Sequence, residues 1–78
     1  MAKFAAASGT ARQVREQREN RGLTQVGLAA KSGLTVWVVR QIEAGRGRTT
    51  GAQIIALAEA MGLEAKDLMP SLAEDELA

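Results

Sequence analysis

The sequence contains no cysteine and no histidine among its 78 residues. Without cysteine, neither a disulfide nor a thiolate metal site can form. Without histidine, the commonest metal ligand and the usual general base near neutral pH are missing. The three serines have no plausible base nearby, and the segment after Gly45 lacks the lysine and the spacing of a phosphate-binding loop. We therefore expect a protein that is not an enzyme, with no catalytic residue, no metal and no cofactor.

Long apolar runs are also absent. No segment approaches the roughly 20 consecutive apolar residues that a membrane-spanning helix needs. Residues 1–10 hold one lysine and a brief alanine-rich stretch, which is too short for a secretory signal. The sequence therefore predicts a cytoplasmic protein with no membrane partner.

Proline occurs only once, at Pro70, whereas several of the eight glycines follow segments with helical apolar spacing. Threonines stand at the opposite ends of these segments, where a hydroxyl can accept hydrogen bonds from unpaired backbone N–H groups. No period-two pattern is long enough for a sheet. These signals predict an all-α fold, a compact five-helix bundle. The expected helices cover residues 11–21, 25–32, 36–44, 51–61 and 65–69.

A chain of this length forms one domain at most. We expect residues 11–69 to be that domain, because all the helical patterns lie within them. Residues 1–10 are expected to form a flexible N-terminal arm. Residues 70–78 are expected to form an acidic C-terminal tail.

The formal net charge of +1 conceals an uneven distribution. Residues 1–48 hold nine of the ten Lys and Arg residues and three of the nine Asp and Glu residues, a formal charge of +6. Residues 49–78 hold the other basic residue and six acidic ones, a formal charge of −5. The asymmetry suggests that the first part binds a polyanion and the second faces elsewhere. Two ordinary solvated helix surfaces would give the same distribution.

The link between the second and third expected helices indicates how the chain contacts a partner. Ser32-Gly33-Leu34-Thr35 combines a glycine able to take positive φ with a capping threonine. Such a turn joins two short helices at a steep angle, so that the second protrudes from the body. A protruding helix fits the major groove of B-DNA, where each base pair shows a distinct pattern of donors and acceptors. Residues 24–44 are therefore interpreted as a helix-turn-helix.

Over about residues 12–69 the sequence resembles the phage repressor and Cro family of helix-turn-helix regulators. The matching residues, in order and with the expected spacing, are Arg18, Gly22-Leu23-Thr24-Gln25, Leu28-Ala29, Gly33, Val39, Gln41-Ile42-Glu43, Gly45, Leu57-Ala58 and Ala60-Met61-Gly62. The resemblance implies the fold of the phage-repressor DNA-binding domain, with residues 36–44 as the recognition helix and double-stranded DNA as the partner.

The resemblance also implies roles for individual residues. Gln25 would donate to a DNA phosphate, helped by the positive end of its helix. Arg40 is the best candidate to bind guanine, through O6 and N7 together, and Gln41 could read adenine or hold a phosphate or a neighbouring side chain. The residues at base-reading positions are Val36, Trp37, Arg40 and Gln41. The loop residues expected along the sugar–phosphate backbone are Arg46, Arg48, Thr49 and Thr50.

Arg18 and Glu43 match a pair that in this family ties the first helix to the end of the recognition helix. Both lie on faces that carry core residues, which a solvated charge would avoid. We interpret them as a structural ion pair rather than as DNA contacts.

The sequence departs from the family pattern in three places. Gly27 replaces a glutamate that often completes a capping box with Thr24, and Thr49 replaces a proline that commonly precedes the next helix. Val36 and Trp37 are apolar where polar residues are more common. They could contact thymine methyl groups, bind another protein, or, for Trp37, fold back onto the core.

The sequence as a whole predicts a sequence-specific transcriptional regulator, a repressor that acts as a homodimer. A single recognition helix covers only a few base pairs, so that operator specificity usually requires two-fold related half-sites. Leucines and a methionine of the acidic C-terminal part provide the expected dimer surface. The residues concerned are Leu63, Leu68, Met69 and Leu72. The alternative is an antitoxin-like or adaptor module of the same fold that binds a protein partner through Val36 and Trp37.

Overall fold

The computed structural model describes the backbone of residues 2–69 and the side chains of residues 9–69. The expected acidic tail over residues 70–78 and the expected dimer contact Leu72 lie outside these described residues. The elements are α1 (Ala2–Asn20), α2 (Gln25–Ser32), α3 (Val36–Glu43), α4 (Gly51–Ala60) and the 3-10 turn η1 (Ala65–Leu68). Residues 2–69 include no strand, so the all-α prediction is confirmed. The fifth expected helix is a single 3-10 turn rather than an α-helix.

The first helix differs from the sequence prediction at its start. It begins at Ala2 rather than near residue 11, and residues 2–10 continue the same helix instead of forming an arm. Alanine is the strongest helix former, and this segment contains alanine at positions 2, 5, 6 and 7. The single Gly9 costs about 1 kcal/mol relative to alanine, which is too little to end a helix of this composition.

Threonine side chains begin the three helices that follow. Thr24 Oγ1 accepts from the Gly27 N–H at 2.9 Å, and Thr35 Oγ1 accepts from the Val38 N–H at 3.1 Å. Thr50 makes a complete capping box, because Gln53 Oε1 also accepts from the Thr50 N–H at 3.0 Å. The caps fix where α2, α3 and α4 start, as their spacing in the sequence predicts.

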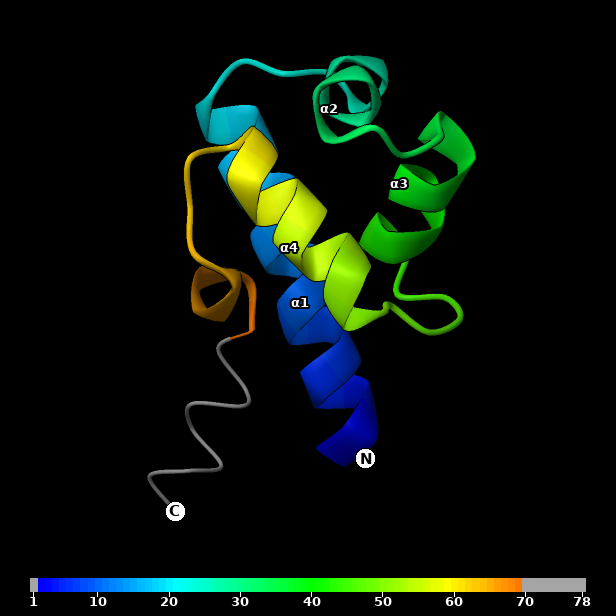
Figure 1. The fold of residues 1–78 in the computed structure, drawn as a ribbon. Helices are drawn as coiled ribbons and strands as arrows, with labels where there is room; N and C mark the ends of the chain where they lie inside the picture. The colour runs from blue at the N-terminus through cyan, green and yellow to red at the C-terminus, as the bar shows by residue number, and fades with distance from the viewer. Residues whose placement is uncertain (1, 70–78) are drawn as a thin grey trace.

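The turn between α2 and α3 requires a glycine. Gly33 has φ of +77°, and its N–H donates to the Ala29 carbonyl at 3.0 Å, which ends α2. Thr35 then caps α3 two residues later, so one helix ends and the next begins within a very short segment. Figure 1 shows the result: α2 lies at the top of the molecule, viewed nearly along its axis, and α3 lies below it at the right.

The core fills the space between the four helices and η1. Val14, Leu28, Val39, Leu57 and Leu68 are fully buried. In the view of Figure 1, α4 is in front of α1, with η1 to the left of these helices and α3 to the right. Arg21 fastens the end of α1 to the end of α4, because its Nε donates to the Met61 carbonyl at 2.8 Å.

The position of η1 corrects one expected dimer contact. Leu68 is 0% exposed and belongs to the core of the chain itself, so it offers no surface to a second copy. The reason is that η1 folds back against α1 and α4, which turns Leu68 inward. Leu63 and Met69 are half-buried and pack against the edge of the same core.

An ion pair holds α1, the α1–α2 link, α2 and α3 together. Arg18 Nε donates to Glu43 Oε2 at 2.7 Å, and Arg18 Nη2 donates to Glu43 Oε1 at 3.0 Å. Arg18 Nη1 also donates to the Leu23 carbonyl at 2.9 Å, and Gln25 Nε2 donates to Glu43 Oε1 at 3.1 Å. The Glu43 side chain is only 3% exposed. Its hydrogen bond raises the pKa of the Arg18 guanidinium.

We expect Glu43→Ala to lower the free energy of unfolding by about 3–5 kcal/mol, because it leaves the Arg18 charge largely buried without its partner. Chemical denaturation monitored by circular dichroism measures the loss. Glu59→Ala, on the exposed face of α4, is the matched control and should change stability by about 0.5 kcal/mol or less. Equal stability of the two variants would contradict the structural role of the pair.

Candidate nucleic-acid interface

The outward face of α3 presents side chains of different character. Arg40 is exposed, Trp37 is 65% exposed and Gln41 is half-buried. Val36 is also half-buried and packs against the core. The two apolar residues therefore do not form one outward pair, since Val36 turns partly inward and Trp37 outward. The exposure of Trp37 rules out the third of its sequence-based interpretations, in which it folds back onto the core.

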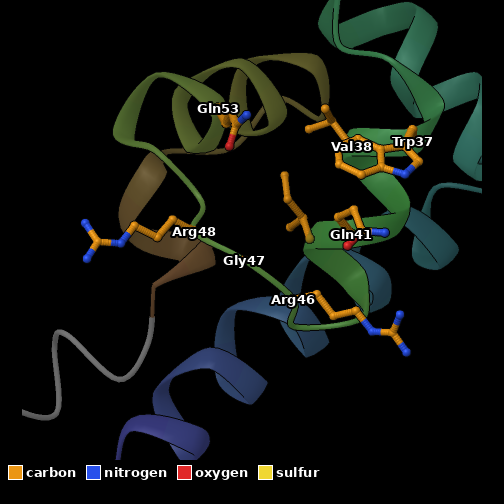
Figure 2. Close-up of a pocket in the computed structure, with 8 residues that line it drawn as sticks. Trp37, Val38, Gln41, Arg46, Gly47, Arg48 and Gln53 are labelled. Atoms are coloured by element: carbon orange, nitrogen blue, oxygen red, sulfur yellow. The ribbon is translucent and has the colours of Figure 1, made fainter.

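The loop between α3 and α4 follows directly from the end of α3. Gly45 and Gly47 both have φ near +70°, a conformation that side chains disfavour. The Arg46 N–H donates to the Gln41 carbonyl at 3.0 Å, which keeps the start of the loop close to α3. Arg46 and Arg48 are exposed, and Figure 2 shows their guanidinium groups extending away from the loop. The loop thus places two exposed positive charges between α3 and α4.

An open groove of about 180 Å³ separates α3 from this loop and from α4. We refer to it as the α3–loop groove. Trp37 and Val38 lie on the α3 side and Gln53 on the α4 side, as Figure 2 shows. None of the lining residues is acidic. The groove therefore combines an aromatic wall with a cationic rim. The full lining comprises Trp37, Val38, Gln41, Ile42, Arg46, Gly47, Arg48 and Gln53.

The remaining phosphate-contact candidates lie at two helix N-termini. Thr50 caps α4 with its hydroxyl oxygen, which leaves the hydroxyl proton free to donate, and Thr49 beside it is half-buried. Gln25 opens α2, but one of its amide hydrogens already donates to Glu43. A side-chain amide has two such hydrogens, so Gln25 retains one for another acceptor while Glu43 holds it in place.

Sequence reasoning missed Gln53, which lines the groove and completes the Thr50 capping box. The signal was present, because a threonine followed three residues later by glutamine is the capping-box pattern. It also missed the bond from Arg21 to the Met61 carbonyl, for which a single sequence contains no signal.

The part of the chain that the structure describes lacks two further features. Residues 2–69 contain no group of three or more His, Cys, Asp or Glu side chains placed to hold a metal ion. In the same region, no helix combines the length and the apolar character that crossing a bilayer requires.

A family model described as Helix-turn-helix matches residues 14–68. The chain belongs to the helix-turn-helix family. The resemblance to phage repressor and Cro proteins is thereby confirmed. As a member of this family, the chain is a DNA-binding regulator.

Solved structures with the same fold include other regulators of the family. The restriction-modification controller protein C.AhdI from Aeromonas hydrophila is 32% identical with a TM-score of 0.81, and the match covers 85% of this chain and 100% of that one. The hypothetical transcription factor NHTF from Neisseria is 28% identical with a TM-score of 0.80, over 94% of this chain and 85% of that one. A comparison with curated proteins finds no match.

One structural neighbour is an enzyme. Fe(II) HppE, in a complex with substrate, is 29% identical with a TM-score of 0.74 over 83% of this chain. The match covers only 38% of HppE, so the likeness concerns a helical part of that protein. The helix-turn-helix family and the two neighbours above are regulators rather than enzymes.

We expect Thr35→Ala to lower the free energy of unfolding by about 1 kcal/mol, because the Val38 N–H at the start of α3 loses its acceptor. Thr35→Ser retains the hydroxyl oxygen and serves as the matched control, with stability close to that of the unmodified chain. Thermal denaturation distinguishes the two variants. A serine variant as unstable as the alanine variant would contradict the capping role.

Proposed function

We propose that this chain is a sequence-specific transcriptional repressor that binds double-stranded DNA as a homodimer and inserts α3 into the major groove. The observation that carries the proposal is the pairing of the exposed Arg40 on α3 with a loop that exposes Arg46 and Arg48. DNA recognition requires base contacts, which read the sequence, and phosphate contacts, which position the protein. Arg40 can donate two hydrogen bonds to a base edge, and Arg46 and Arg48 supply the cations for the phosphates.

The proposal divides the contacts into two groups. Arg40 binds guanine through O6 and N7, and Gln41 reads an adjacent base or supports Arg40. Trp37 contacts the base edges, and Val36 reaches them only with the part of its side chain that the core leaves exposed. The phosphate contacts, which are independent of sequence, come from Gln25, Arg46, Arg48, Thr49 and Thr50.

Dimer formation is proposed through the acidic C-terminal part of the chain. Leu63 and Met69 are half-buried at the edge of the core and are the described residues that support this surface, now without Leu68. In Figure 1, η1 lies on the side of the molecule away from α3, so a partner there would leave α3 free. A dimer that covers an operator excludes other proteins from the same DNA, which is the physical basis of repression.

A protein-binding adaptor is the second candidate function. The 65% exposure of Trp37 favours it, because exposed aromatic side chains are enriched at the centres of protein interfaces. The names of C.AhdI, a controller protein, and NHTF, a transcription factor, favour the DNA-binding candidate instead.

Selection from a random pool of duplex DNA, followed by sequencing, tests the proposed function. The expected result is enrichment of a palindrome with half-sites about one helical turn apart, bound with an affinity that falls steeply as salt rises. If no sequence were enriched, the adaptor function would replace the DNA-binding one.

We expect Arg40→Ala to weaken binding to the selected operator by about 1–3 kcal/mol and to relax the choice of base at one position of each half-site. Repeating the selection with the variant measures both effects. Lys66→Ala, an exposed lysine on η1, is the control and should leave the preferred base unchanged. An unaltered preference in the Arg40 variant would contradict its role as a base reader.

We expect Arg46→Gln and Arg48→Gln, combined, to lower the affinity about equally for operator and random duplex. Each lost phosphate contact should also make the slope of log K against log salt shallower by about one. Titrations over a range of salt concentrations give this slope. A loss confined to the operator, with an unchanged slope, would show that these arginines read bases instead.

A further inference from the structure

The exposed indole of Trp37 lacks an explanation within the folded chain. Val36 gains packing from the core, whereas Trp37 remains 65% exposed on the same turn of α3. A large apolar side chain left in water breaks the pattern that the rest of α3 follows, and such exceptions are expected at functional sites.

The surroundings of Trp37 indicate what it contacts. It forms one wall of the α3–loop groove. The exposed Arg46 and Arg48 belong to the loop that borders the groove, and their guanidinium groups extend away from it in different directions (Figure 2). Glu43, the carboxylate of α3, is buried and bound to Arg18, so it does not offset the charge of the groove. The occupant that fits is DNA: the edge of a base pair would contact Trp37, and phosphates of the adjoining DNA backbone would lie near the two arginines.

The chemistry of the indole restricts what it can read on that edge. Its polar group is one N–H donor, with no acceptor, so it cannot make the paired hydrogen bonds that distinguish one base from another. The apolar feature of the major groove is the C5 methyl group of thymine. Contact between the ring and this methyl group removes apolar surface of both from water.

We propose that Trp37 recognises the C5 methyl group of one pyrimidine in each half-site, so that DNA binding depends on whether that pyrimidine is methylated. The proposal rests on the proposed DNA-binding function. Thymine and 5-methylcytosine carry the same methyl group at the same ring position, facing the major groove. Methylation of a cytosine at this position would therefore strengthen binding. Burial of one methyl group corresponds to about a fourfold change in affinity.

The test uses the operator selected with the unmodified chain. Each thymine of a half-site is replaced in turn by deoxyuridine, which removes only the methyl group. We expect about a fourfold loss of affinity at one thymine. Placing cytosine or 5-methylcytosine at that position should give a similar ratio in favour of the methylated base. Trp37→Gln should abolish both ratios.

Ile55→Gln is the matched control, because Ile55 is 50% exposed on α4 and does not line the groove. This variant should retain both ratios. Methyl dependence that persists in the Trp37 variant would overturn the proposal, and so would a tight, specific operator complex with no methyl dependence at any thymine. Failure to select any operator would instead count against the proposed function as a whole.

Discussion

The bidentate contact between Arg18 and Glu43 is the interaction on which the placement of α3, the proposed recognition helix, depends. Glu43 is the last residue of α3, and its carboxylate receives donors from α1 and α2, while Arg18 also binds the carbonyl of Leu23. Replacing a buried ion pair by apolar residues is often neutral or stabilising, so the pair is not explained by net stability alone. Its donors have fixed directions, which apolar contacts lack, and they set the position of α3 relative to α1 and α2. The orientation of the outward side chains on α3 follows from that position.

The charge distribution of the sequence follows the same arrangement. The basic part of the chain supplies α3 and the loop with Arg46 and Arg48, whereas most acidic residues lie after residue 48. Arg46 and Arg48 are exposed next to the groove, and Glu43 is withdrawn into its ion pair. A net charge of +1 for the whole chain therefore understates the positive potential that a polyanion would meet at α3.

Much of the fold could be predicted from the sequence because the signals are local. Thr24, Thr35 and Thr50 cap helices where their spacing predicts, and Gly33 makes the turn that only a positive φ allows. The errors concern features that local signals do not determine. The start of α1 depends on the helix propensity of the alanines at its N-terminus, which exceeds the cost of Gly9. The burial of Leu68 depends on how η1 folds back onto α1 and α4. The exception is the separation of Val36 from Trp37, for which the sequence held a local signal: Val36 lies three residues before the buried Val39 on the same face of the helix, whereas Trp37 is turned about 100° away.

The central claim is that α3 and the following loop form the surface that meets DNA. Backbone amide chemical shifts, recorded while the labelled chain is titrated with a selected operator duplex, test it most directly. The account predicts that the largest changes fall on residues 36–50 and at the N-termini of α2 and α4, with small changes in η1. Changes concentrated on η1 and the adjoining end of α4, with α3 unaffected, would contradict it.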